Sequence, residues 1–166
     1  MRGWPDEVGW DALGARCLDP VCGVAFARQT LPKPNPESLM QRRDLNAPDA
    51  PPPAAAYTQA IEVTGATRPL YISGQIGQRI DGTIPADIVE QSRLAWQNLE
   101  AQLKAAGMTL DNLVKITTIL PDQGDIVAAR EGRGAVLGDR RPASTLIVGG
   151  LANPAWKIEV EGIAVA

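Results

Sequence analysis

Two glutamates near the C-terminus, Glu159 and Glu161, are the acidic side chains whose spacing best suits a functional site. They lie two positions apart in a β-branched run, so in a strand both carboxylates point to the same face. Their neighbours Ile158, Val160 and Gly162 would point to the other face. One face of this strand therefore lies on a core and the other on water or a cleft. The pattern alone leaves open whether the carboxylates serve a cleft or form a solvated strand face.

The chain contains no histidine and only two cysteines, Cys17 and Cys22. The absence of histidine excludes Ser-His-Asp triads, Cys-His dyads, histidine general bases and every metal site that uses histidine. The two cysteines supply at most half a zinc site, so no metal site is predicted. We expect them to be ordinary thiols, with a single local disulfide as the alternative.

Composition favours one soluble domain that does not bind nucleic acid. The 166 residues are 45% hydrophobic and 21% charged, which is typical of a globular chain with a core of its own. The net charge of -3 and the aromatic content of 4% predict neither a basic patch nor a base-stacking platform. No apolar run reaches the roughly 18 residues of a membrane helix. Acidic residues near the N-terminus do not fit a signal peptide, so a cytoplasmic location is expected.

The first part of the chain differs from the rest and predicts a domain boundary near residue 50. Residues 1–49 show no sustained periodicity, and from Leu31 the chain becomes Pro-rich and polar. We expect 1–49 to be a disordered or loosely packed extension and 50–166 to be the folded domain. Met40 is an alternative start, which would make residues 1–39 either an appendage or an upstream misassignment.

The first half of the domain predicts two strands and a helix. Alternation predicts strands at 57–64 and 70–77, joined by a turn as an antiparallel hairpin. Glycines in the second strand indicate a bulge or a close approach of a ligand to the backbone. A helix is expected over 85–107, because Asp87 can cap it and small or apolar residues recur every three or four positions. Gly107 is placed to end it.

The second half predicts a strand, a helix and two more strands. A β-branched strand is expected at 114–120, followed by a helix at 124–137 with Asp122 as its cap. Two apolar runs at 145–148 and 158–165 flank a Gly- and Pro-containing loop, which favours neighbouring strands. Strand pairs at both ends with helices between them predict an α+β domain, β-β-α-β-α-β-β, with one mixed sheet and both helices on one face.

Several segments, in order, resemble the RidA (reactive intermediate deaminase A) family, which is also called the YjgF or endoribonuclease L-PSP family. They are YTQ, LYISGQIG, the helix ending in AAG, VKITTIL, RPAS and KIEVEGIAVA. The resemblance covers about 50–166. It implies a chorismate-mutase-like fold that forms a homotrimer, with three clefts between neighbouring subunits. Three-fold association would also cover a sheet face that is otherwise exposed and apolar.

The resemblance implies a cofactor-independent chemistry. Members of the family hydrolyse reactive enamines and imines, such as 2-aminoacrylate, to keto acids and ammonia. An arginine holds the substrate carboxylate by a bidentate pair, and a glutamate with backbone groups positions water. The arginine position, after Pro142 and Ala143, is occupied here by Ser144. A charge-assisted hydrogen bond contributes about 1.5–3 kcal/mol, so this exchange predicts weak binding of 2-aminoacrylate.

Other family positions are retained. Tyr57 matches a cleft tyrosine, Ser73 and Gly74 match a Ser-Gly pair, and Glu159 matches the water-positioning, catalytic glutamate. Tyr57 has the alternative role of a half-buried strand aromatic, and Ser73 that of a turn former. The hydroxyl groups of Ser144 and Thr145 are candidate partners for a neutral or differently charged ligand. The nearby Arg140 and Arg141 lie either at the cleft mouth or in an exposed loop.

Three functions follow from these residues. The first is a deaminase that acts on an enamine, an imine or a related small metabolite in a cleft between subunits. The second is a non-catalytic trimer that binds or senses a small metabolite. The third is ribonuclease activity, which some relatives are credited with. An acidic chain without histidine or a basic stripe does not favour the third.

Overall fold

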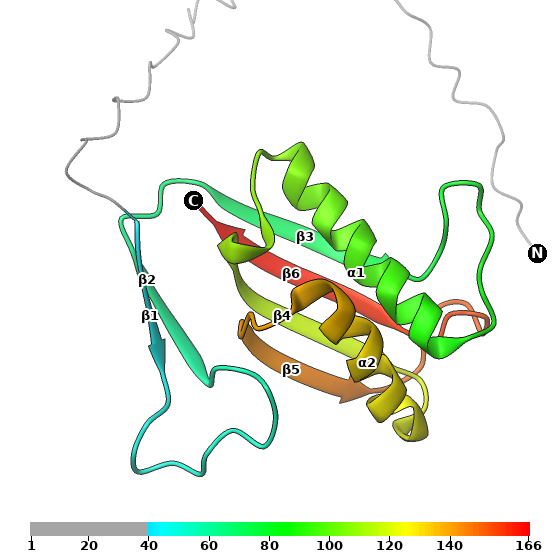
Figure 1. The fold of residues 1–166 in the computed structure, drawn as a ribbon, viewed down its shortest axis with the longest axis horizontal. Coiled ribbons are helices and arrows are strands. Elements are labelled where there is room, and N and C mark those ends of the chain that lie inside the picture. The colour runs from blue at the N-terminus through cyan, green and yellow to red at the C-terminus, as the bar shows by residue number, and fades with distance from the viewer. Residues whose placement is uncertain (1–39) are drawn as a thin grey trace, which may run out of the picture. The chain divides into compact units, whose positions relative to one another are not determined.

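The computed structural model describes residues 40–166, which form six strands and two α-helices. The strands are β1 Gln41–Leu45, β2 Ala60–Thr64, β3 Pro69–Ile76, β4 Leu113–Leu120, β5 Ala143–Val148 and β6 Glu159–Val165. The helices are α1 Ile88–Ala105 and α2 Ile126–Leu137, and short 3-10 turns, η1 Leu110–Asn112 and η2 Gln123–Asp125, precede β4 and α2. From β2 onward the element order is the predicted one (Figure 1).

The main sheet has the strand order β3-β6-β4-β5. β6 is antiparallel to both of its neighbours, whereas β4 and β5 run parallel. A parallel pair needs a crossover connection, and α2 supplies it. Both helices cover the same face of the sheet (Figure 1), so the expected α+β architecture is confirmed. The other face, which we call the open face, carries no helix in the described part of the chain.

The predicted hairpin between 57–64 and 70–77 is wrong. β2 pairs with β1 in a separate two-stranded sheet, and β3 pairs with β6. The reason lies in the connection after β2. The backbone N–H groups of Thr67 and Arg68 donate to the carbonyl oxygen of Ala166 at 3.0 and 2.9 Å, which draws the start of β3 to the end of the chain.

The prediction that 145–148 and 158–165 form neighbouring strands is also wrong, because β4 lies between β5 and β6. β6 is an inner strand whose core-facing residues Val160 and Ala164 are fully buried. β5 instead lies at the end of the sheet order and has four exposed residues, Thr145 to Val148. A ten-residue loop connects β5 to β6. One apolar run therefore lies at the edge of the sheet and the other lies inside it.

The folded region begins earlier than residue 50. β1 pairs with β2 from Gln41 opposite Thr64 to Leu45 opposite Ala60. The side chain of Arg42 connects β1 to the main sheet. It donates hydrogen bonds to the carbonyl oxygens of Leu113 at 3.2 Å and Arg141 at 3.4 Å. The residues of β1 are mostly polar and do not alternate with apolar ones, so the sequence pattern did not predict this strand. The predictions for residues 1–39, including both cysteines, lie outside the described residues.

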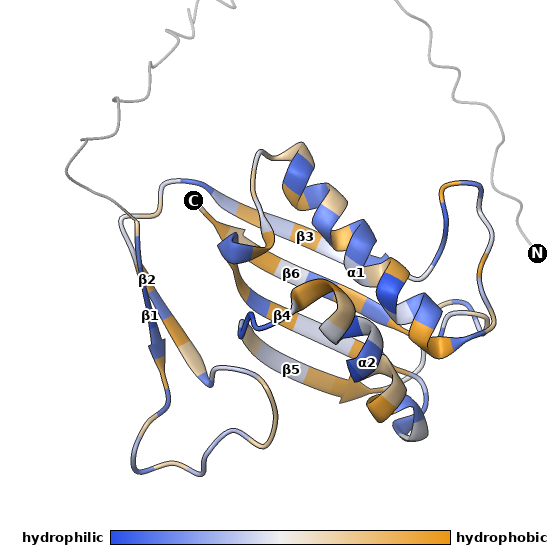
Figure 2. Ribbon diagram, in the orientation of Figure 1, coloured by the Kyte–Doolittle hydropathy of each residue, from blue (hydrophilic) through white to orange (hydrophobic). Residues whose placement is uncertain are grey.

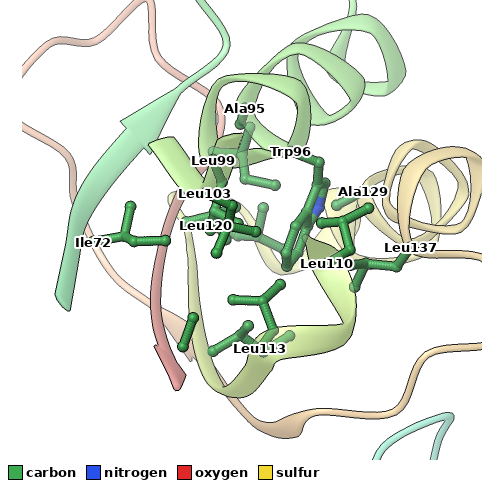
Figure 3. Close-up of a cluster of buried hydrophobic side chains, with 14 of the residues drawn as sticks. Ile72, Ala95, Trp96, Leu99, Leu103, Leu110, Leu113, Leu120, Ala129 and Leu137 are labelled. Carbon is green, nitrogen blue, oxygen red and sulfur yellow. The ribbon is translucent and has the colours of Figure 1, made fainter. Parts of the chain in front are cut away.

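Helix α1 follows its sequence signals. The Asp87 carboxylate accepts from the backbone N–H of Glu90 at 2.8 Å, and Gly107 ends the helix with a φ of 70°. The hydropathy colouring alternates along α1 and the strands, as expected for elements with one buried side (Figure 2). Trp96, Leu99 and Leu103 are fully buried and form the centre of the core over the sheet (Figure 3).

Candidate functional site

A pocket of about 220 Å³ on the helix side of the sheet brings together two of the predicted site residues, Tyr57 and Ser144. Ser144 faces this side because it pairs with Ile116, whose side chain is fully buried in the core. Tyr57 lies just before β2, where the neighbouring Thr58 forms a parallel bridge with Ala143. The apolar part of the lining comes from Trp96, Ile126, Ala129, Leu146 and Ile158. We call this cavity the helix-side pocket.

The other predicted residues, Ser73, Gly74, Thr145 and Glu159, lie away from this pocket. Glu159 pairs with Ile119 on β4, one position from the core-facing Thr118 and Val160 pair, so its side chain is on the open face. Thr145 is exposed on the same face, where the ammonium group of Lys115 donates to its hydroxyl oxygen. The predicted separation of Glu159 and Glu161 from the buried Ile158 and Val160 is confirmed.

Gly74 lies against the side chain of Glu159 on the open face. The register of β3 against β6 shifts between Ile72 and Gln75, which confirms the predicted bulge. A Cβ atom built on Gly74 would overlap the carboxyl group of Glu159. The absence of a side chain at Gly74 therefore leaves room for the Glu159 side chain to lie directly against the strand backbone. Ser73, next to Gly74 in the same irregular stretch of β3, is exposed.

The predicted site residues thus fall on two faces of one sheet. Tyr57 and Ser144 line the helix-side pocket, and Ser73, Gly74, Thr145 and Glu159 lie on the open face. The sheet and its buried core separate the two groups. One chain alone does not bring them together.

Two arginines of α2, Arg130 and Arg133, line the helix-side pocket and were not identified from the sequence. Arg133 is half-buried and donates from Nη2 to the carbonyl oxygen of Ala56 at 3.1 Å. Its Nε is buried and has no hydrogen-bond partner among the described residues. Burial lowers the pKa of Arg133, and the positive charges of Arg141 and Arg130 lower it further. Their spacing of three residues on a helix was the available signal.

Arg140 and Arg141 do not line the helix-side pocket. They border an adjoining cavity of about 150 Å³, which shares Arg130 and Arg133 with it. Arg140 is engaged by Asp111, with 2.7 Å between Nε and the carboxylate; this hydrogen bond lowers the pKa of Asp111 and raises that of Arg140. Arg141 lies 3.6 Å from the carboxylate of Asp139. Both loop arginines therefore have acidic partners.

Within residues 40–166, no group of three or more acidic, cysteine or histidine side chains is arranged to hold a metal ion. No helix in this range is both long and apolar enough to cross a bilayer.

Comparisons with known proteins agree with the fold. The model of the family described as endoribonuclease L-PSP matches residues 47–166. The 2-iminobutanoate/2-iminopropanoate deaminase of Mus musculus is 32% identical over 132 residues, which cover 77% of this chain and 94% of that protein. The mitochondrial protein mmf2 of Schizosaccharomyces pombe is 36% identical over 111 residues, covering 65% of this chain and 86% of that protein.

A solved structure shows the same architecture. The Rid-family protein YyfB from Yersinia pestis, described as of unknown function, superposes with a TM-score of 0.65 at 25% identity, covering 75% of this chain and 98% of that one. The fold and site thus define an α+β domain of the Rid type. The chain belongs to the endoribonuclease L-PSP family, known also as the RidA or YjgF family, as its sequence segments predicted.

Proposed function

We propose that the protein hydrolyses small enamines or imines derived from amino acids, in a cleft formed where two copies of the chain meet. The observation that carries the proposal is the distribution of the retained family residues over two faces of the sheet. Copies that place the helix-side pocket of one chain against the open face of the next would bring Tyr57 and Glu159 together. Three-fold symmetry closes such a head-to-tail contact into a homotrimer.

The reaction adds water to a carbon–nitrogen double bond. A C–O bond forms at the imine carbon, the C–N bond then breaks, and the products are a keto acid and ammonia. In this arrangement the Glu159 carboxylate accepts a hydrogen bond from the attacking water, takes up its proton and then returns the proton to the nitrogen that leaves as ammonia. Gly74 leaves room for this carboxylate to lie against the β3 backbone. No cofactor is required for these steps.

Ser144 sets the expected preference. It occupies the position where the family resemblance implies a carboxylate-binding arginine. Serine provides one hydroxyl group, whereas arginine provides a positively charged guanidinium group with several N–H donors. We therefore expect little activity on 2-aminoacrylate and more on other imines. The name of the mouse relative, an iminobutanoate and iminopropanoate deaminase, supports this class of substrate. The location is proposed to be cytoplasmic, although the fission yeast relative is named as mitochondrial.

The test is the rate of keto-acid formation from a series of 2-imino acids generated in situ by an amino-acid oxidase. The wild type should accelerate hydrolysis of at least one of them above the spontaneous rate. Glu159→Gln should lower that acceleration by about 10²-fold or more, because it removes the proton acceptor and preserves the shape. Glu100→Gln is the control, since this carboxylate lies on α1, which covers the opposite side of the sheet from the open face, and pairs with Lys104; it should retain the rate.

Either of two results would contradict the proposal. Wild-type protein that leaves every spontaneous rate unchanged would favour the metabolite-binding alternative. Equal rates in Glu159→Gln and the wild type would remove Glu159 from the reaction.

A further inference from the structure

The helix-side pocket contains positive charge that no acidic group of the described chain neutralises. Arg130 and Arg133 project from α2 into its lining, and no carboxylate within residues 40–166 lies within 4.0 Å of either guanidinium. The neighbouring Arg140 and Arg141 do have such partners, Asp111 and Asp139. Arg130 and Arg133 therefore differ from the other cations around this cavity.

The guanidinium group of Arg133 is partly buried, and a buried positive charge without a bound anion raises the free energy of the folded state. Arg133 is half-buried between α2 and the segment before β2, and only its Nη2 has a partner, the carbonyl oxygen of Ala56. A charged group removed from water needs a counter-charge and hydrogen bonds to compensate for its lost hydration. The nearby Arg130 and Arg141 add repulsion, in agreement with the lowered pKa of Arg133. An anion in the pocket would relieve both effects.

A second unpaired donor lies in the wall of the same pocket. Trp96 is fully buried and lines the cavity, and its indole Nε1 has no hydrogen-bond partner among the described residues. The indole nitrogen is turned toward α2, beside Ala129 (Figure 3). Buried indole N–H groups usually find an acceptor. An acceptor bound against α2 would supply one.

We propose that the helix-side pocket binds a small organic acid, whose carboxylate is held by Arg133 together with Arg130 of α2 instead of by an arginine at position 144. The guanidinium fork of Arg133 can pair with both carboxylate oxygens. The apolar walls, Ile126, Leu146 and Ile158, then enclose the aliphatic part of the acid. A volume of about 220 Å³ suits a small metabolite, because drug-sized ligands need roughly 300–1,000 Å³.

This inference rests on the proposed function for its choice of ligand class, and it is compatible with weak activity on 2-aminoacrylate. A carboxylate held by α2 lies at a different wall from one held by β5, which carries Ser144. The reacting carbon of a three-carbon enamine is then displaced from the position that a β5 clamp would give it. In an acid with a longer chain, the reacting carbon can still reach the position that a β5 clamp would give it.

The test is calorimetric titration of the full chain with 2-oxobutanoate, with the neutral 2-oxobutanamide and with inorganic phosphate. The wild type should bind the acid at least about tenfold more tightly than the amide, and Arg133→Gln should lose about tenfold or more of the affinity for the acid alone. Arg93→Gln is the control, since this arginine lies on α1 and pairs with Gln97 and Glu90. It should leave the affinity unchanged.

Two further variants separate a binding role from a folding role. If Arg133→Gln does not fold, Arg133→Lys keeps the charge and should retain part of the affinity, and Arg130→Gln should lose several-fold. Equal affinity for the acid and the amide in the wild type, or tighter binding of phosphate than of the acid, would overturn the inference. Binding is measured without turnover, so an Arg133-dependent affinity in a protein without deaminase activity would reject the proposed function alone.

Discussion

At the scale of single residues, the positive charge of the helix-side pocket comes from α2. Position 144 on β5 holds a serine, and the guanidinium groups of the helix-side pocket come from Arg130 and Arg133 on α2. An arginine introduced at position 144 would enter a pocket in which Arg133 already lies close to other positive charges. Introducing an arginine at position 144 and preserving the helix arginines are therefore opposing changes.

Ser144→Arg should raise hydrolysis of the enamine that a PLP-dependent dehydratase forms from serine, from a low wild-type level. The new guanidinium faces the same pocket and can hold a carboxylate in bidentate fashion. Recovery should be partial, because Arg130 and Arg133 repel the new charge. Combining Ser144→Arg with Arg133→Gln should increase the recovery. The measurement is the rate of pyruvate formation in the coupled assay.

Two outcomes would contradict this account of position 144. High wild-type activity on the serine-derived enamine would mean that the α2 arginines position a three-carbon substrate as well as a β5 arginine does. A folded Ser144→Arg variant with no gain, alone or combined with Arg133→Gln, would mean that the pocket differs from the family in more than this residue.

The residues of the site were only partly predictable from the sequence. The segment containing Tyr57 and the one containing Ser144 are matched by family resemblance, and their meeting in one pocket needed the structure. Arg130 and Arg133 carry no local motif. Their role depends on which side of α2 packs against α1, and that is decided by contacts with another helix. The spacing of Arg130 and Arg133 indicates that they share a face of the helix, but it does not show that this face lines a pocket.

At the scale of elements, the pocket depends on how closely α2 packs on α1. Gly132 is buried in α2, and a Cβ built on it would lie 2.5 Å from the Ser92 Cβ and 2.7 Å from the Val89 carbonyl oxygen. Ser92 also donates from its hydroxyl group to the carbonyl oxygen of Ala129 at 2.8 Å. Gly132 therefore permits the close approach of the two helices.

Gly132→Ala should therefore destabilise the fold, and Gly134→Ala on the same helix should stabilise it. Alanine gains up to about 1 kcal/mol of helix propensity over glycine at either position. At Gly132 the overpacking against backbone costs about 1–3 kcal/mol, which outweighs that gain. At Gly134 nothing lies within 4 Å of the added Cβ. Denaturant unfolding followed by circular dichroism measures both, and a shift of the same sign in the two variants would contradict the packing argument.

Element types were predictable where local signals agree, and strand partners were not. Asp87 and Gly107 mark the limits of α1, and alternation marks the buried face of β6. Periodicity tells which face a strand buries, but it does not tell which strand lies beside it. The wrong pairings of β2 with β3 and of β5 with β6 both come from assuming that strands adjacent in sequence are adjacent in space.

At the scale of the whole molecule, the open face is the surface that association would use. It is mixed in character, not uniformly apolar as expected. Tyr71 is 75% exposed and Ile147 46% exposed, and the polar Lys115, Thr117 and Glu161 line a shallow depression on it. The predicted homotrimer would cover this face and place Glu159 against the helix-side pocket of a neighbour, so oligomerisation and catalysis are linked in the proposal.

The most direct measurement is complementation between two inactive variants. Glu159→Gln removes the carboxylate of the open face, and Ser144→Phe fills the helix-side pocket. If each site takes one face from each of two neighbouring copies, co-expression of the variants should leave about one site in four intact and restore imine hydrolysis accordingly. Light scattering should show trimers for each variant alone and for the mixture. A trimeric mixture no more active than its separate components would contradict a site shared between chains, as would a stable monomer that retains full wild-type activity.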